Sequence, residues 1–349
     1  MRTLGKVAPA MILLFTLCMS SATPAIAKYK PPTCIKTSPY DTVPFKAERF
    51  VRVAPGVKLE LLDWGGSGEV MVLLAGAGDN AHLFDYFAFQ FTSFFHVIAI
   101  TRRGWLPSSQ PKNGYDVDTR AADDIKALDA LGIKRAVFVG HSIAGSELSK
   151  IAVKYPSYVD RLVYLDASDL SKRYTFPDIP NPFSLLIDAD AKSLFTLQAA
   201  YARLLATREP IPAICLSFEF DKDGMITGTS TPQSVYDQLN RGVRDPVNPP
   251  TNWADIKQPR LGIFAPPTLE SKLPYYWYLV PAEKALFDER FPRYLQWFGD
   301  AVDKFGEKHP GTPTPEVYLL PGASHYVYIN NEAEVVRQMR FFLRIPGSR

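Results

Sequence analysis

Residues 135–148 read RAVFVGHSIAGSEL, an apolar run that leads into small residues around one serine. Residues 136–139 have the β-favouring composition of a strand, and a strand that passes into a helix needs a residue that stops it. Gly140 and Ala144, on either side of Ser142, leave room for a tight turn that holds the serine in a strained, exposed position. The stretch therefore predicts a nucleophile elbow, with a strand-to-helix turn that merely packs as the alternative.

Apolar runs and amphipathic segments alternate along most of the chain. We expect strands at 48–53, 57–64, 70–76, 95–104, 135–140, 160–168, 259–265 and 316–325, and helices at 119–132, 143–154, 183–206, 232–241, 281–306 and 331–343. This alternation predicts an α/β fold, a mainly parallel sheet with helices on both faces. Residues 169–256 interrupt the alternation, and we expect them to form an inserted lid over the carboxyl edge of the sheet, where ligands of such folds bind.

The first 27 residues have the layout of a signal peptide. Two basic residues precede an apolar run at 8–19, and Ala-Ile-Ala at 25–27 gives a small-x-small cleavage site. We therefore expect the mature protein to begin near Lys28 and to be exported, either to the periplasm or out of the cell. No integral membrane anchor would then remain, whereas a retained N-terminal anchor is the alternative.

Export would place the remaining cysteines in an oxidising compartment. Cys18 leaves with the signal peptide, so the mature chain keeps Cys34 and Cys215. Two such thiols can pair, and we predict a Cys34–Cys215 disulfide. The alternative is one cysteine in a loop and the other in an apolar environment.

The composition is that of a globular protein with a large core. Of the 349 residues, 46% are hydrophobic and 21% are charged, and the net charge is +3. Because the chain has no long basic run, we expect no nucleic-acid partner. Its five histidines are scattered and no Cys/His spacing resembles a metal site, so we expect no metal and no cofactor.

Two further stretches supply partners for Ser142. A serine hydroxyl is a weak nucleophile until a base takes its proton, and His325 follows the last expected strand in a Gly-containing loop at the same sheet edge. A polar surface histidine is the alternative. Gly76, Ala77 and Gly78 follow an earlier buried strand, where small residues let backbone N–H groups approach a developing oxyanion.

These stretches together resemble the α/β-hydrolase fold family. The residues that carry the resemblance are 140–145 (GHSIAG), 76–78 (GAG), 101–104 (TRRG) and 322–325 (GASH). The resemblance implies Ser142 as the nucleophile, His325 as the base, and the backbone amides of Ala77 and Ile143 as the oxyanion hole. The layout that it implies is a signal peptide at 1–27, an extension at 28–47, a core at 48–168 and 257–349, and the lid at 169–256.

The sequence offers more than one candidate for the acid that would orient His325. Most family members carry it after the strand equivalent to 259–265, where Glu270 is the only carboxylate nearby. Some members place it after the strand that follows the elbow, and this chain has Asp166 there. A carboxylate at the buried mouth of a sheet needs a partner, which a histidine that becomes charged provides. We predict Asp166 as the acid, Glu270 as second choice and Asp169 as third; capping a turn or pairing with the lid is the alternative role of Asp166.

Two groups of side chains have alternative roles. Tyr276 and Trp277 belong to an aromatic run at 275–278, which either walls an apolar substrate pocket or packs the lid onto the sheet. We predict the substrate-binding role for both. Arg102 and Arg103 either steer an anionic substrate or form an ion pair that supports their loop.

We therefore expect an exported serine hydrolase, an esterase that cleaves a carboxylic ester or similar carbonyl bond of a small molecule through an acyl-enzyme. Amide, lactone or carbon–carbon bond hydrolysis and acyl transfer are alternatives on the same triad, and so is a binding or sensor protein that has lost turnover. Family members that act on haloalkanes or epoxides have Asp at the place of Ser142, which disfavours those reactions. The lid has no motif that identifies the substrate.

Overall fold

The computed structural model describes residues 47–167, 216–220, 226–244, 252–269, 276 and 279–346. The chain divides into two units, Met1–Pro31 and Pro32–Arg349, and every described residue belongs to the second. Several predictions fall outside the described residues: the signal peptide, the helix at 183–206, the Cys34–Cys215 disulfide, and the roles of Asp169, Glu270 and Trp277.

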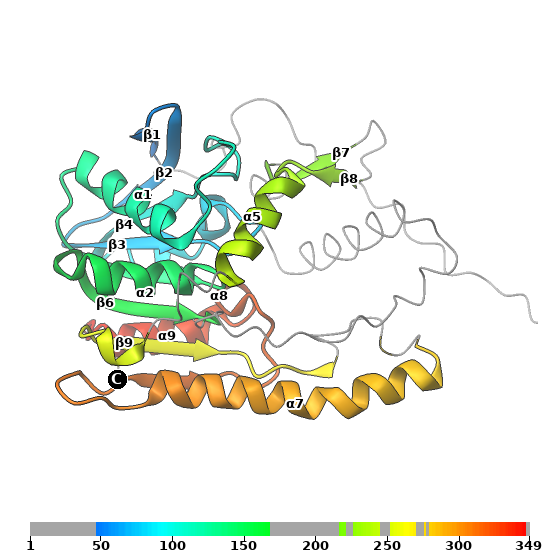
Figure 1. Cartoon of the computed structure of the whole chain (residues 1–349). Helices are drawn as coiled ribbons and strands as arrows, with labels where there is room; N and C mark the ends of the chain where they lie inside the picture. Colours follow the sequence, from blue (N-terminus) through cyan, green and yellow to red (C-terminus); the bar gives the residue numbers. More distant parts are fainter. Residues whose placement is uncertain are drawn as a thin grey trace, which may run out of the picture. The chain divides into compact units, whose positions relative to one another are not determined.

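An eight-stranded sheet forms the centre of the second unit, with the strand order β1-β2-β4-β3-β5-β6-β9-β10 (Figure 1). The strands are β1 Ala47–Ala54, β2 Val57–Gly65, β3 Glu69–Leu74, β4 Phe95–Thr101, β5 Ala136–His141, β6 Val159–Leu165, β9 Arg260–Phe264 and β10 Glu316–Leu319. β1, β2 and β4 pair in antiparallel fashion, and all other neighbours are parallel. The predicted α/β fold with a mainly parallel sheet is confirmed.

Helices cover this sheet, and most of them match the expected segments. The α-helices are α1 Val117–Ala130, α2 Ala144–Lys154, α5 Gln233–Arg244, α7 Pro281–Gly306, α8 Val327–Asn330 and α9 Glu332–Phe342. Short elements were not expected from the sequence: 3-10 helices at Ala81–Phe84, Ala88–Gln90, Pro156–Tyr158 and Trp253–Asp255, and a separate hairpin of β7 Phe218–Phe220 and β8 Ile226–Thr229. Segments this short contain too few residues to show a helical or alternating period.

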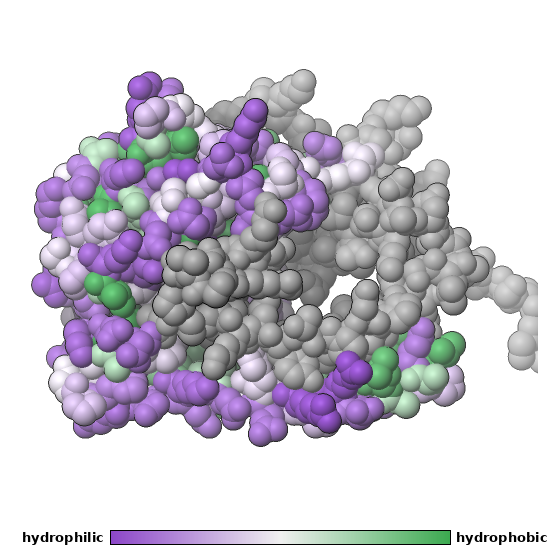
Figure 2. Space-filling view, viewed as in Figure 1, coloured by the Kyte–Doolittle hydropathy of each residue, from purple (hydrophilic) through white to green (hydrophobic). Residues whose placement is uncertain are grey.

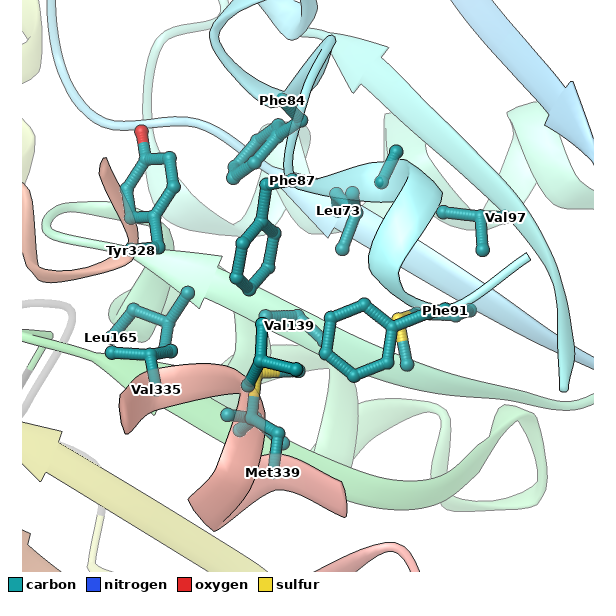
Figure 3. Packing of buried hydrophobic residues seen from close by; sticks show 14 of the residues in the cluster. Leu73, Phe84, Phe87, Phe91, Val97, Val139, Leu165, Tyr328, Val335 and Met339 are labelled. Carbon is teal, nitrogen blue, oxygen red and sulfur yellow. The ribbon is translucent and has the colours of Figure 1, made fainter. Parts of the chain in front are cut away.

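The sheet has a hydrophobic core on each face, because successive residues of a strand point to opposite faces. On one face Leu73 and Val139 pack against the 81–91 segment and against Val335 and Met339 of α9 (Figure 3). On the other face Val72 and its neighbours pack against α1, α2 and the end of α7. Both faces of the inner strands are therefore buried, as their continuous apolar sequences predict.

The strand order brings the ends of distant segments together. β6 and β9 pair in parallel although residues 166–259 lie between them in the sequence. Part of this intervening stretch contacts the loop after β4. The Thr231 hydroxyl donates to the Gly104 carbonyl at 3.2 Å, and the side-chain amide of Gln110 donates to the Ser230 carbonyl at 2.9 Å. The part of the expected lid at residues 230–231 is thus attached to the carboxyl edge of the sheet, whereas Trp253 and Ile256, near its end, pack into the core.

The described surface is mostly hydrophilic in the view of Figure 2, with small apolar patches. The large hydrophobic side chains that are exposed come from separate elements: Phe50, Tyr86, Val153, Val280, Leu295, Val317, Leu319 and Phe341. Within the described ranges, no helix combines the length and the hydrophobicity that a membrane span requires.

Candidate active site

Ser142 occupies the turn between β5 and α2 in a left-handed backbone conformation, with φ of 55°. This conformation is uncommon for a residue other than glycine and stores strain at the position. The Ser142 amide donates to the carbonyl of Leu165 at 3.2 Å, which fixes the turn to the end of β6. The sequence 140–145 thus forms the strained strand-to-helix turn that it predicts, with the serine at its apex.

Small residues around the serine allow β5 and α2 to approach closely. A methyl group at Gly140 would lie 2.7 Å from the Leu148 side chain and 3.1 Å from the Cβ of Ala144. These contacts are closer than ordinary van der Waals contacts, so a Cβ at position 140 would force Leu148 or Ala144 to shift. This explains the glycine at the end of the strand.

Asp166 and His325 lie side by side at the carboxyl ends of β6 and β10. The Asp166 Oδ2 atom is 2.6 Å from His325 Nδ1, and the second carboxylate oxygen accepts from the Ala265 amide at 2.9 Å. Only 13% of the Asp166 side chain is exposed, compared with 43% of the His325 side chain. A carboxylate acceptor requires a proton on Nδ1 of the neutral ring, which leaves Nε2 free to accept one.

The backbone of Asp166 is held as firmly as its side chain. Its φ is 43°, and its amide donates to the Ile263 carbonyl at 2.7 Å. Aspartate tolerates this left-handed conformation better than most residues. Since Ser142 binds the carbonyl of Leu165, the residue before Asp166, both positions are anchored at the same strand end.

His141 lies between the serine turn and the His325 loop. Its Nε2 atom donates to the carbonyl of His325 at 3.0 Å, and the two rings are 4.5 Å apart between centroids. Burial lowers the pKa of His141 well below its usual range, so the ring is neutral. The other nitrogen, Nδ1, has no hydrogen-bond partner among the described residues. His141 therefore supports the backbone of the His325 loop.

Asp79 lies in the loop after β3, within reach of this group. Its carboxylate is 3.9 Å from His141 Nδ1, and the Tyr326 hydroxyl donates to it at 3.3 Å. Burial raises the pKa of Asp79 to about 7, against the opposing effect of His325. A methyl group at Gly76 would lie 2.7 Å from the Asp79 carboxylate, so Gly76 leaves the space that Asp79 occupies.

Arg102 and Arg103, which have two alternative roles in the sequence, are both buried in ion pairs. Arg102 binds Glu147 of α2, with Nη2 to Oε2 at 2.6 Å, and Arg103 binds Asp123 of α1 at 2.6 Å. Each side chain is 6% exposed. Their guanidinium groups therefore support the surrounding backbone, in agreement with the ion-pair alternative.

Helix α5 covers the residue that follows the serine. Val235 and Leu239 of α5 pack with Trp105 and Ile143 in a small buried cluster. A methyl group at Gly78 would lie 3.4 Å from the Tyr236 hydroxyl, so this helix also approaches the loop after β3. The described part of the expected lid thus contributes apolar side chains close to Ser142.

Tyr276, which the sequence predicts to bind substrate together with Trp277, packs against α7. Its hydroxyl donates to the Asp288 carboxylate at 2.8 Å, and its ring packs with Leu279 and Phe287. Its substrate-binding role stays a prediction. Within the described ranges, no group of three or more His, Cys, Asp or Glu side chains is arranged to hold a metal ion.

Sequence reasoning did not single out Asp79, His141, Tyr326 or Glu147 as parts of this site. Asp79 and Tyr326 are 247 positions apart, and nothing in the local sequence of either residue announces the other. His141 sits inside the elbow motif, but its contact with His325 depends on how the last loop folds back over β5. By contrast, Ser142, His325 and Asp166 could be read from the sequence because each follows an expected strand.

Comparisons with known proteins agree with this architecture. Residues 71–338 match the model of a family described as the alpha/beta hydrolase family. Epoxide hydrolase 3 of Mus musculus is 32% identical over 152 residues, which span 41% of this chain and 41% of that protein. The 2-(acetamidomethylene)succinate hydrolase of Mesorhizobium japonicum is 24% identical over 75% of this chain and 83% of that protein. A crystal structure of E-2-(acetamidomethylene)succinate hydrolase shares the fold, with a TM-score of 0.57 and 20% identity over 86% of this chain and 99% of that chain. The chain belongs to the alpha/beta hydrolase family.

Proposed function

We propose that this protein is a serine hydrolase that cleaves a carboxylic ester or a similar carbonyl bond through an acyl-enzyme at Ser142. Family membership supports a hydrolase in general. The observation that carries the finer proposal is the pairing of Asp166 with His325 at 2.6 Å, at the strand end to which the Ser142 amide is also bound. In a serine hydrolase the acid orients the base, and the base takes the proton of the nucleophile; Asp166, His325 and Ser142 would have these three roles.

The reaction would begin when the Ser142 hydroxyl attacks the carbonyl carbon and His325 Nε2 takes its proton. The carbonyl oxygen becomes an oxyanion, which the Ala77 and Ile143 amides would stabilise. Asp166 balances the positive charge on the imidazole ring. When the tetrahedral intermediate collapses, the proton passes from His325 to the leaving alcohol. The oxygen of a water molecule then attacks the acyl carbon while His325 Nε2 takes a proton from it. As the bond between the acyl carbon and the Ser142 oxygen breaks, His325 returns this proton to Ser142 and the acid leaves.

The two named relatives suggest different substrates. The epoxide hydrolase matches about two fifths of either chain, so its reaction is no guide to the substrate of this chain. Since family members that open epoxides have Asp at the place of Ser142, we propose a carbonyl substrate for this chain. The apolar cluster of Trp105, Ile143 and α5 next to Ser142 favours an acyl group with a hydrocarbon part.

Hydrolysis of p-nitrophenyl esters of increasing acyl length tests this proposal. We expect the wild-type protein to release p-nitrophenol in an initial burst, followed by slower steady turnover as the acyl-enzyme hydrolyses. Ser142→Ala should lose the burst while keeping its thermal unfolding transition. A folded wild-type protein that is inert toward the whole series would favour the silent binding or sensor protein instead.

We also propose that the chain is exported and cleaved before Lys28, on the basis of the signal-like N-terminal sequence. Mass spectrometry of the exported protein should find an N-terminus at or near Lys28. An exported protein that still begins at Met1 would overturn this part of the proposal without affecting the catalytic one.

A further inference from the structure

Arg102 connects the loop after β3 to the helix that follows Ser142. Its Nη2 donates to the Ala75 carbonyl at 2.7 Å and its Nη1 donates to the Gly76 carbonyl at 2.8 Å. On the opposite side, Nε and Nη2 donate to the two carboxylate oxygens of Glu147 at 2.9 and 2.6 Å. The planar fork of one guanidinium thus joins two backbone carbonyls to one helix.

The hydrogen bond to Gly76 fixes the direction of the next amide. A peptide group is planar and trans, so the carbonyl of Gly76 and the N–H of Ala77 lie in one plane and point in opposite directions. When Arg102 holds the carbonyl on one side, the N–H has to face the other side. The same bond polarises the peptide group and makes the Ala77 N–H a stronger donor.

We propose that Arg102 is a positioning residue that sets the orientation of the Ala77 N–H in the oxyanion hole. The inference deepens the proposed function and rests on it, because the oxyanion exists only in that reaction. Glu147 links Arg102 to the second proposed oxyanion donor, because Glu147 lies in the first turn of α2 and Ile143 is the residue that precedes this helix. Arg102 and Glu147 therefore hold the two donors in a fixed relation to each other.

The surroundings leave the Arg102 guanidinium a single position. It lies over the Trp105 ring at 5.4 Å from the centroid, and Glu147 also accepts from Arg120 at 2.7 Å. Arg102, Arg120 and Glu147 are all nearly inaccessible to solvent, and the attraction of Glu147 keeps the pKa of Arg102 above its usual value despite burial. A lysine could not replace this fork, because its single ammonium cannot meet two carbonyls and a carboxylate in one plane.

Arg103 provides a matched control. It is the next residue, is equally buried, and pairs with Asp123 at 2.6 Å. Its Nη1 atom donates to the Asn113 carbonyl at 3.2 Å, not to the loop after β3. Arg103→Lys and Arg102→Lys therefore disturb comparable ion pairs, but only the second releases the Gly76–Ala77 peptide.

Steady-state kinetics on p-nitrophenyl acetate distinguish a residue that positions the oxyanion donor from one that only forms a buried ion pair. Loss of one oxyanion donor lowers kcat by roughly 100- to 1000-fold in known enzymes, and we expect Arg102→Lys to lower kcat by about 100-fold. KM should stay within about threefold, because the ground-state carbonyl carries little of the charge that the donor stabilises. The inhibition constant of a trifluoromethyl ketone, which forms a tetrahedral oxyanion, should rise by a similar factor of about 100. Arg103→Lys should keep kcat within about threefold.

A labelled peptide bond gives a readout that does not depend on activity. The sequence contains two Gly–Ala pairs, at 76–77 and 322–323. Protein labelled with ¹³C-carbonyl glycine and ¹⁵N-alanine therefore gives two carbonyl–amide correlations in an NMR spectrum. Arg102→Lys should shift the Gly76–Ala77 signal and leave the Gly322–Ala323 signal in place, whereas Arg103→Lys should move neither.

The outcomes distinguish this inference from the proposed function. If the wild-type protein hydrolyses esters but Arg102→Lys keeps its kcat, or loses no more than Arg103→Lys, the inference is wrong and the hydrolase stands. If the wild-type protein is inert, the hydrolase fails, and an unmoved Gly76–Ala77 signal in Arg102→Lys would separately refute the positioning role. Should Arg102→Lys not fold, Glu147→Gln, which keeps the side-chain volume but loosens the fork, should show the same kcat loss and the same shift.

Discussion

The carboxylate of Asp166 binds His325 with one oxygen and the Ala265 amide with the other, at 2.6 and 2.9 Å. The second contact holds the carboxylate plane, so the first oxygen has a fixed direction toward Nδ1. The Asp166 backbone, at φ of 43°, is bound to the end of β9. The imidazole therefore has one orientation and one favoured tautomer before any substrate arrives.

Replacing Asp166 with asparagine should abolish most of the activity while keeping the fold. Asparagine adopts the left-handed conformation readily and can still accept from the Ala265 amide. It cannot, however, favour the tautomer with a proton on Nδ1 when its NH₂ group faces the ring. We expect kcat on p-nitrophenyl acetate to fall by about 10⁴-fold, the size of this effect in the serine proteases.

Glu270→Gln is the matched carboxylate control, because Glu270 is the second sequence candidate for the acid. We expect it to keep kcat within about tenfold, since Asp166 already occupies His325 Nδ1. If Glu270→Gln lowers kcat more than Asp166→Asn does, or if Asp166→Asn keeps most of its turnover, the assignment of Asp166 as the acid is wrong.

Asp79 should make the stability of the protein fall as the pH rises from about 4 to about 7. The folded protein holds a proton on Asp79 up to a pKa of about 7, whereas an ordinary aspartate releases it near 3.8. In this window the folded state binds more protons than the unfolded state, so the free energy of unfolding decreases with pH. The linked change is on the order of 4 kcal/mol, at about 1.4 kcal/mol per pH unit between the two values.

The Asp79→Asn variant has no carboxyl group at this position, so comparing it with the wild type isolates the effect of Asp79 on stability. Urea unfolding of both proteins should show that the variant gains stability relative to the wild type between pH 4 and pH 8. Other groups titrate in both proteins and cancel in the difference. Parallel stability curves over this range would mean that Asp79 is ionised in the folded protein.

Gly140→Ala and Gly299→Ala should change stability in opposite directions. The added methyl group at Gly140 meets the end of the Leu148 side chain at 2.7 Å and the Cβ of Ala144 at 3.1 Å, so these neighbours have to shift, at a cost of about 1–3 kcal/mol. At Gly299, inside α7, the methyl group meets nothing within 4 Å, and the better helix propensity of alanine stabilises by up to about 1 kcal/mol. Thermal unfolding measures both effects; equal shifts would show that close packing does not explain the glycine at 140.

The sheet and its helices could be predicted from the sequence because their signals are local. Residues 70–74 of β3 and 136–139 of β5 are continuously apolar, and the segment of α1 has apolar residues at helical spacing. Strand ends in a parallel sheet meet at one edge, so Ser142, Asp166 and His325 could be placed near one another from their positions after strands.

The partners of the supporting residues could not be predicted, because their contacts depend on tertiary structure. The sequence allows an ion pair for Arg102, but Arg102 and Glu147 are 45 positions apart, and the local sequence does not show which carboxylate or carbonyls the arginine binds. The same holds for Asp79, whose pKa depends on burial beneath Tyr326 and beside His141. The hairpin of β7 and β8 escaped prediction because its strands have three and four residues.

Covalent labelling shows directly whether the folded site activates the Ser142 hydroxyl. The folded protein is treated with a fluorophosphonate, and the modified residue is located by mass spectrometry of its peptides. We expect one adduct, on Ser142, which disappears in Ser142→Ala and in urea-unfolded protein, because only the folded site activates the hydroxyl. Ser146→Ala, one turn along α2 where the hydroxyl donates to the Ile143 carbonyl at 2.8 Å, should keep the adduct. A folded wild-type protein that carries no adduct, or carries it on another residue, would show that Ser142 is not an activated nucleophile.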